Sequence, residues 1–229
     1  MFAALLLASS LFSPFVVQQA ENSSVVVYAN VTEKIDGVVE KVKNDSICSG
    51  FVVYGRPKDD LLVVTARHCV ESEMHLVGDD VLTIDLQPTH VAFFDGDRGK
   101  VKAVAISTTD DVAFLLVHTS RNHPAAKLTN DFYRGENLFE IGMPLGASWS
   151  ISPAVAMQGP IYTGTTDLPG WLYSYLVSCP SCGPGSSGGP MFDAQGRVTG
   201  ILVGGNLIQS VIIPAHRIVF SAQHTKIVQ

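Results

Sequence analysis

Short runs of β-branched and aromatic residues recur along most of this chain, and clusters of turn-forming residues separate them. Strands of this length and spacing are typical of β-barrels and β-sandwiches. The runs lie at 47–54, 61–65, 81–86, 91–94, 101–106 and 112–118 in the first half, and at 137–141, 150–157, 161–163, 171–178, 191–192 with 197–203, and 207–213 in the second. The sequence therefore predicts an all-β fold with two sets of six strands.

Two segments outside these runs carry helical signals. Residues 32–42 have apolar side chains at helical spacing, and Thr32 is suited to cap a helix there. Near the other end, Pro214 is suited to the first turn of a helix over 214–221. We therefore expect a short N-terminal helix and a C-terminal closing helix, with 122–126 crossing between the two sets of strands.

Composition limits the class of protein. The 229 residues, 46% hydrophobic and 16% charged, can bury one large core or two small ones. A net charge of -6 gives no electrostatic reason to expect nucleic acid or an anionic membrane surface as a partner.

The first twenty residues differ from the rest because they carry no charged side chain. They begin with an apolar run over 2–8, and Ser, Pro and Gln residues follow it. This composition predicts a secretory signal peptide over 1–20, with Ala20 or Ala29 as the last residue removed. Serines and Pro14 interrupt the segment short of the roughly 20 apolar residues that a membrane span needs. An uncleaved anchor and a buried segment are the alternatives, and no stable membrane span is expected.

The Gly-rich stretch 183–190 surrounds Ser187 with residues that leave room for a substrate carbonyl. Such a tight turn lets neighbouring N–H groups converge on one point, where they would stabilise an oxyanion. Upstream, His68 follows one strand-like run and Asp111 precedes another. A serine hydroxyl becomes a nucleophile when an imidazole takes its proton and a carboxylate orients that imidazole. His68, Asp111 and Ser187 therefore form a chemically complete set, although the stretch alone would also fit a flexible loop.

Five motifs carry a resemblance to a known family. They are Cys48-Ser-Gly-Phe51, Thr65-Ala-Arg-His68-Cys69, Asp111-Val-Ala-Phe-Leu115, Ile141-Gly-Met-Pro-Leu-Gly146 and Gly185-Ser-Ser187-Gly-Gly-Pro190. Their order and spacing, with 43 residues from His68 to Asp111 and 76 from Asp111 to Ser187, resemble the trypsin-like serine protease family. Within it the chain is most similar to the bacterial branch that includes the high-temperature-requirement proteases and the glutamyl endopeptidases. The resemblance runs from about 47 to about 219.

The resemblance implies two six-stranded antiparallel β-barrels packed side by side. The expected units are a lead over 21–45 that holds the short helix, a first barrel over about 46–121, a second over about 127–213 and the closing helix, with 46–229 as the protease domain. His68 and Asp111 then belong to the first barrel and Ser187 to the second, so the site should lie in the cleft between them. Because only 42 residues follow Ser187, we expect no PDZ domain, which is usual in the high-temperature-requirement group.

The resemblance also implies a serine endopeptidase that hydrolyses peptide bonds through an acyl-enzyme intermediate. Ser187 would attack the carbonyl carbon, His68 would accept and later donate the proton, and Asp111 would orient His68. Backbone N–H groups of Gly185 and Ser187 would form the oxyanion hole. Asp110 is the competing acid, but the family motif has the acid directly before Val-Ala, and strand alternation should send the two carboxylates to opposite faces. The expected partner is a polypeptide substrate, with no cofactor, metal ion or nucleic acid.

By alignment with the family, Val203, Gly204 and Gly205 should form the wall of the substrate pocket and Ser181 its floor. No acid is placed there to bind Arg or Lys, and Leu202 stands where glutamyl endopeptidases carry a histidine. The predicted preference is an uncharged, small to medium apolar residue at the cleavage point.

The four cysteines are an even number, which favours an oxidising compartment, secreted or periplasmic. The family resemblance implies a disulfide between Cys48 and Cys69. Cys179 and Cys182 depart from the family pattern, because no later cysteine is present to pair with this loop. A small disulfide between them is favoured, and a redox pair or half a zinc site are the alternatives.

Ser186 stands where digestive zymogens of the family carry an acid that pairs with a newly freed N-terminus. The chain also has no Ile-Val-Gly-Gly segment to supply that terminus. We therefore expect activity without this cleavage.

Two other function classes fit parts of the sequence. A binding protein can keep this fold without turnover. An α/β-hydrolase esterase would use Gly185 to Gly189 as its nucleophile elbow and pair Asp193 with His216 or His224. The elbow requires a helix directly after the serine, whereas two glycines and Pro190 follow it here and begin a helix badly.

Overall fold

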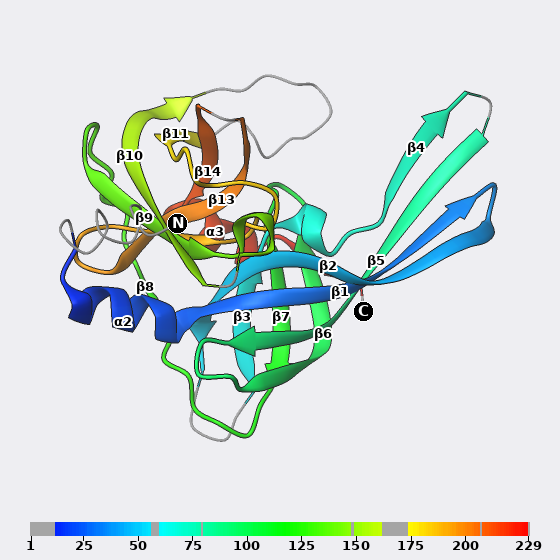
Figure 1. Cartoon of the computed structure of the whole chain (residues 1–229), viewed down its shortest axis with the longest axis horizontal. Helices are drawn as coiled ribbons and strands as arrows, with labels where there is room; N and C mark the ends of the chain where they lie inside the picture. The colour runs from blue at the N-terminus through cyan, green and yellow to red at the C-terminus, as the bar shows by residue number, and fades with distance from the viewer. Residues whose placement is uncertain are drawn as a thin grey trace.

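The computed structural model describes residues 12–55, 60–78, 80–147, 149–161, 174–206 and 208–228. Its strands form two closed antiparallel barrels, with a helix near each end of the chain (Figure 1). The predicted fold class is therefore confirmed. This arrangement also excludes the α/β-hydrolase alternative, because the strand β12 (Pro190–Phe192), and not a helix, follows the Gly-rich turn.

Six strands close the first barrel in the hydrogen-bonding order β6-β7-β3-β2-β1-β5, and β5 pairs with β6 to complete the ring. They are β1 (Ser24–Ile35), β2 (Val38–Tyr54), β3 (Leu61–Thr65), β5 (Asp80–Phe93), β6 (Arg98–Ser107) and β7 (Ala113–His118). Two further strands, β4 (Glu73–Val77) and β15 (Thr225–Ile227), extend the sheet beyond the ring by pairing with β5 and β6.

Six strands close the second barrel in the order β12-β9-β10-β11-β14-β13, with β12 paired to β13. Besides β12 they are β9 (Asn137–Gly142), β10 (Ser150–Ile161), β11 (Ser174–Ser178), β13 (Arg197–Gly205) and β14 (Ser210–Pro214). The two-residue strand β8 (Lys127–Leu128) adds to β13 in parallel. The helix α3 (Ala215–Ala222) follows β14 directly, close to the predicted closing helix at 214–221.

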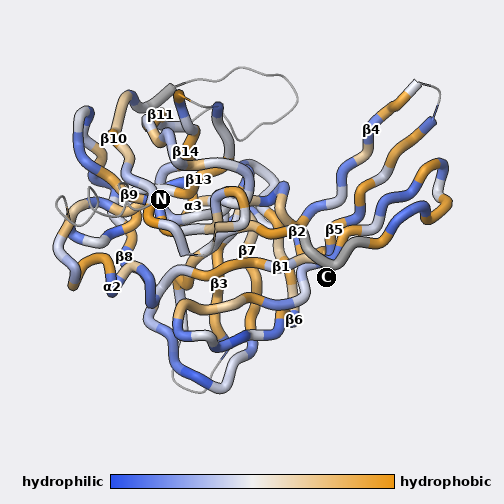
Figure 2. The backbone as a smooth tube through the Cα atoms, in the orientation of Figure 1, coloured by the Kyte–Doolittle hydropathy of each residue, from blue (hydrophilic) through white to orange (hydrophobic). Residues whose placement is uncertain are grey.

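The strands alternate apolar side chains into the barrels, as expected for sheets with one buried face. Figure 2 shows the resulting hydrophobic stretches along the strands of the first barrel. One cluster of buried side chains runs from Leu61 and Leu115 in the first barrel to Phe139 and Ile201 in the second. The two barrels therefore share a continuous core, which fixes the turns of one barrel against those of the other.

The N-terminal helix was predicted in the wrong place. Residues 32–42 are not helical: β1 ends at Ile35, Asp36 and Gly37 form the turn, and β2 begins at Val38. Both turn residues have positive φ, 48° and 82°, which is the requirement of the tight hairpin turn that Asp-Gly favours. The apolar residues at helical spacing lie instead on a hairpin that projects from the barrel beside β4 and β5 (Figure 1). The first barrel thus begins at Ser24, earlier than the predicted boundary at 46.

The helix near the N-terminus is α2 (Pro14–Ser23), which lies across the predicted cleavage point after Ala20. Ala20 is buried, and the ring of Phe12 lies 4.5 Å from the ring of Phe139 in the second barrel. The signal peptide over 1–20 stays a prediction. In the described parts of the chain, no helix has the length and apolar character of a membrane span.

Other strand predictions differ in detail. The expected strands 81–86 and 91–94 are a single strand, β5, whose pairing with β1 is irregular between Tyr28 and Ala29. Strands β1, β4, β8 and β15 were not predicted. The count of six in the first barrel is nevertheless right, because β1 makes up for the merger within β5. The predicted strand at 161–163 and the start of the one at 171–178 lie outside the described residues, except for Ile161 at the end of β10.

Candidate active site

His68 lies in a single 3-10 turn, Arg67–Cys69, that follows the end of β3. Its backbone N–H donates to Asp111 Oδ1 at 2.9 Å, and its ring Nδ1 lies 2.7 Å from Asp111 Oδ2. Asp111 comes from the loop before β7, the strand that pairs with β3. The Asp111 carboxylate therefore binds both the backbone N–H and the ring Nδ1 of His68. These two contacts fix the orientation of the ring and leave the other ring nitrogen, Nε2, available for proton transfer.

Burial of the His68 ring disfavours its charged form. The hydrogen bond and negative charge of Asp111, with a smaller contribution from Glu73, outweigh this effect and raise the pKa of His68 above its ordinary value. The Asp111 carboxylate thus stabilises the protonated, imidazolium form of His68.

Asp110, the competing acid, points elsewhere. Its side chain is fully buried and accepts hydrogen bonds from Arg217 at 3.1 and 2.9 Å, from Ser221 at 2.6 Å and from Thr109 at 2.8 Å. Arg217 and Ser221 belong to α3, so Asp110 fastens the C-terminal helix to the first barrel. Asp110 is committed to this network, and Asp111 is the acid that contacts His68.

The turn that carries Ser187 is tied to the first barrel through Ser49 on β2. The Ser49 N–H donates to the Ser187 carbonyl at 2.8 Å, and the Ser49 hydroxyl donates to the Gly185 carbonyl at 2.8 Å. Thr65, at the end of β3, donates in turn to the Ser49 carbonyl at 2.8 Å. The Cys69 sulfur, one residue after His68, lies 3.8 Å from the Ser187 carbonyl oxygen. The structure therefore brings the backbones of the histidine and serine turns together.

Only glycine fits this turn at position 188. Gly188 has φ of +83°, and a Cβ there would lie 2.2 Å from the Ser49 carbonyl oxygen and 2.3 Å from the Thr65 hydroxyl. Its N–H donates to the Leu202 carbonyl at 2.7 Å. The absence of a side chain thus allows the Gly188 backbone to lie close against β2 and β3 of the first barrel, directly beside Ser187.

The N–H groups of Gly185 and Ser187 point to no protein acceptor among the described residues, whereas Ser186 N–H donates to the Gly183 carbonyl at 2.9 Å. Two such unpaired donors flanking one turn are what an oxyanion hole requires. In the same described part of the chain, no hydrogen bond joins the Ser187 hydroxyl to His68. Such bonds are often long in unliganded enzymes and tighten when substrate binds.

A cavity of about 530 Å³ opens beside Ser187. Its lining residues are Cys182, Gly183, Pro184, Ser187, Leu202, Gly204, Gly205, Asn206 and Ser210. Of the residues expected to form the substrate pocket, Gly204 and Gly205 line this cavity. Val203 and Ser181 do not, because Val203 packs into the main core and Ser181 is exposed to solvent. The pairing of β13 with β14 is irregular between Leu202 and Gly204, and Leu202 and Ser210 line the cavity instead.

Both expected disulfides are present. Cys48 and Cys69 join β2 to the histidine turn with a Cα–Cα distance of 6.2 Å, and Cys179 and Cys182 close a small loop with a distance of 5.3 Å. The first bond holds together the two segments that contact the Ser187 carbonyl. The second closes the loop that lines the cavity through Cys182, as the favoured interpretation predicted, and no group of three or more potential metal ligands lies among the described residues.

Sequence reasoning did not single out Ser49 or Glu140. Ser49 lies in the quoted motif Cys48-Ser-Gly-Phe51, but nothing in the sequence alone indicates its contacts with a turn 136 residues away. Glu140 is fully buried on β9, and a charged residue within an apolar strand is a signal that could have been noticed.

Comparison with known proteins identifies the family. The model of the trypsin-like peptidase domain matches residues 48–201, more than half of the chain. The chain belongs to the trypsin-like peptidase family. The match extends from the disulfide-bonded strand β2 through the histidine turn to β13, so it includes every residue of the candidate triad.

Relatives of this trypsin-like chain include the probable periplasmic DegP-like serine endoprotease of Halomonas elongata, 30% identical over 159 residues, and the serine protease HTRA3 of Rattus norvegicus, 26% identical over 155. The matches cover 68% and 67% of this chain but only 29% and 31% of those proteins. This trypsin-like chain therefore corresponds to less than a third of each curated relative.

Solved structures share the fold. The active form of the Rv3671c protease from M. tuberculosis superposes with a TM-score of 0.63 at 20% identity, covering 96% of this chain and 88% of that one. A serine-to-alanine variant of the HtrA-type protease AlgW, solved with a tripeptide, gives a TM-score of 0.65 at 19% identity, covering 91% and 61%.

Proposed function

We propose that this trypsin-like chain is a serine endopeptidase that cleaves polypeptides through an acyl-enzyme intermediate. Ser187 attacks the peptide carbonyl while His68 takes its proton, and Asp111 stabilises the resulting imidazolium. The N–H groups of Gly185 and Ser187 bind the oxyanion. His68 then donates the proton to the leaving amine. In the second half of the reaction, water attacks the acyl-enzyme while His68 takes its proton, and His68 returns that proton to Ser187 as the acyl group is released.

The two contacts of the Asp111 carboxylate with His68 are the observation that supports this proposal most strongly. A carboxylate that receives both the backbone N–H and the ring Nδ1 of one histidine, at 2.9 and 2.7 Å, keeps the other ring nitrogen ready to act as a base. A structural histidine gains nothing from lying beside a serine turn with two unpaired N–H donors. A binding protein on this fold would have no need to keep all of these groups.

Reaction with a fluorophosphonate probe tests the proposal. The probe phosphonylates activated serines, so the wild-type protein should become labelled and Ser187→Ala should not. Ser181→Ala is the matched control, because Ser181 is an exposed serine in the neighbouring loop, and it should be labelled like wild type. An unlabelled wild-type protein would support the silent binding protein instead, and labelling that persists in Ser187→Ala would contradict the assignment of the nucleophile.

The lining of the cavity supports a preference for uncharged side chains at the cleavage point. Its walls are glycines, Leu202, Asn206 and Ser210, with no acidic or basic side chain among the described lining residues. A charged substrate side chain would lose its hydration there without gaining an ion pair.

A peptide library should therefore show enrichment of small to medium apolar residues immediately before the cleaved bond. Lys, Arg, Asp and Glu should be depleted at that position. Strong selection for Arg or Glu would refute the proposed specificity while leaving the triad untouched.

We also propose that the protein acts outside the cytoplasm, secreted or periplasmic. Both disulfides favour an oxidising compartment. The relative from Halomonas elongata is named as periplasmic, which is consistent with this assignment.

A further inference from the structure

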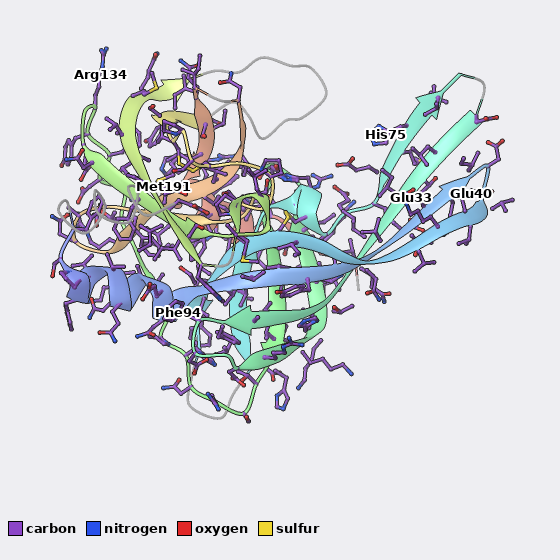
Figure 3. All side chains as sticks on the ribbon, in the orientation of Figure 1. Glu33, Glu40, His75, Phe94, Arg134 and Met191 are labelled. Atoms are coloured by element: carbon purple, nitrogen blue, oxygen red, sulfur yellow. A yellow bond between two sulfur atoms is a disulfide. The ribbon has the colours of Figure 1, made fainter. Side chains whose placement is uncertain are left out.

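Glu140 is a fully buried acid that has no role in the proposed reaction. It lies on β9, between Ser152 on β10 and Met191 on β12, the latter labelled in Figure 3. Within the described residues, neither carboxyl oxygen of Glu140 has a hydrogen-bond partner, and the Ser152 hydroxyl is equally unpaired. Buried polar groups are nearly always paired, so this cluster calls for an explanation.

Two glycines make the space that the Glu140 carboxyl occupies. A Cβ on Gly142 would lie 1.9 Å from Glu140 Oε1, and a Cβ on Gly189 would lie 2.7 Å from the same oxygen. The Cβ on Gly189 would also lie 2.8 Å from the Ser186 carbonyl oxygen. The carboxyl therefore lies against Gly189, in the turn that carries Ser187.

The surroundings of Glu140 favour its neutral form. Burial raises the pKa of this carboxyl to about 8, and the hydroxyls of Ser152 and Ser186 offset that rise only in part. The neighbours from β10, β12, β2 and the turn are Ser152, Met191, Ser49, Ser186 and Gly189, none of which titrates or carries a charge. At neutral pH the carboxyl therefore keeps its proton.

We propose that Glu140 is a positioning residue whose neutral carboxyl packs beneath Gly189 and Ser186 and so holds the N–H groups of Gly185 and Ser187 toward the oxyanion. This inference rests on the proposed role of Ser187. Loss of the proton leaves an unpaired carboxylate in the core, which must be relieved by water entry or by movement of the turn. Either change misaligns the oxyanion hole, and losing one donor of such a site lowers the rate by about 10²–10³-fold. Activity therefore falls in alkaline solution.

The pH profile of activity distinguishes the effect of Glu140 from that of the catalytic base, His68. Deprotonation of His68 switches activity on as pH rises, and a triad alone would then stay active. Ionisation of Glu140 adds a loss on the alkaline side, so the labelling rate of wild type should fall about tenfold for each pH unit above the pKa of Glu140 until the misaligned site limits it. Glu140→Gln has nearly the same shape, cannot ionise and retains N–H donors, so it should keep its rate through the same range.

The experiment measures the rate of fluorophosphonate labelling from about pH 6 to about pH 10 for wild type, Glu140→Gln and Glu40→Gln. Glu40 is an exposed carboxylate on the distant β1–β2 hairpin, labelled in Figure 3, and its variant should follow the wild-type profile. Infrared spectra of Ser187→Ala should contain the carbonyl band of a protonated carboxyl at neutral pH. That band should vanish over the pH range in which wild-type labelling falls.

Each outcome decides one question. Labelling that does not depend on Ser187 defeats the proposed function, whatever the pH profile. Labelling that depends on Ser187, with parallel profiles for wild type and Glu140→Gln, overturns the role of Glu140 alone. If Glu140→Gln does not fold, the infrared band decides: a band lost together with labelling supports the role, and a band absent at neutral pH refutes it.

Discussion

Replacing His68 with alanine should lower kcat for a peptide substrate by about 10⁶-fold. The reason is that the Ser187 hydroxyl then has no base, and the Asp111 carboxylate loses the only ring that it orients. Ser187→Ala should cost about as much, and the double variant should cost little more, because residues that act as a unit lose their whole effect when one is removed. Steady-state hydrolysis of a chromogenic peptide by the three variants measures this non-additivity.

A second histidine provides a matched control. His118 also has an aspartate at its Nδ1, with Asp60 Oδ1 at 2.8 Å, but the pair is exposed on the first barrel. His118→Ala should keep kcat within about twofold of wild type, because exposed ion pairs contribute little. If His118→Ala lowered kcat as much as His68→Ala, the position of His68 beside Ser187 would not explain its effect on kcat.

The features that the sequence predicted correctly are those with a local signature. The turns that carry His68 and Ser187 are marked by their own neighbours: a strand end in one case and consecutive glycines in the other. Short apolar runs between turn residues were enough to predict two sets of six strands, and the family resemblance implied that each set closes into a barrel. Cys48 and Cys69 could be paired because each lies within a recognisable motif.

The features that the sequence concealed depend on contacts between distant segments. In 32–42 the apolar spacing fits a helix, and the Asp36-Gly37 pair overrides it only because β1 and β2 have partners in the barrel to complete. Ser49 acts through bonds to Gly185 and Ser187 that exist only after both barrels form. The lining of the cavity beside Ser187 also depends on such contacts, since the irregular pairing of β13 with β14 lies where Leu202, and not Val203, lines it.

Asparagine in place of Asp111 should lower kcat by about 10⁴-fold while leaving the fold intact. The amide has nearly the same shape as the carboxylate, so the backbone bond to His68 can remain. An amide NH₂ facing Nδ1 favours the wrong tautomer, however, with the proton on Nε2, where the base must be free. It also removes the charge that raises the pKa of His68, so the remaining activity should become half-maximal at lower pH. The pH profile of kcat/KM tests both effects.

The neighbouring Asp110→Asn is the sharpest control, because it changes the same atoms one residue away. The Asp110 carboxylate is buried and bonded to Arg217 and Ser221 of α3, so the substitution takes the negative charge away from the Arg217 guanidinium. Breaking a buried pair costs about 3–5 kcal/mol, which urea unfolding should detect, whereas kcat of the folded fraction should change little. The two aspartates thus have different expected roles: Asp111 contacts His68 and should affect kcat, whereas Asp110 binds α3 and should affect stability. If Asp110→Asn lost kcat and Asp111→Asn lost only stability, the assignment of the orienting acid would be reversed.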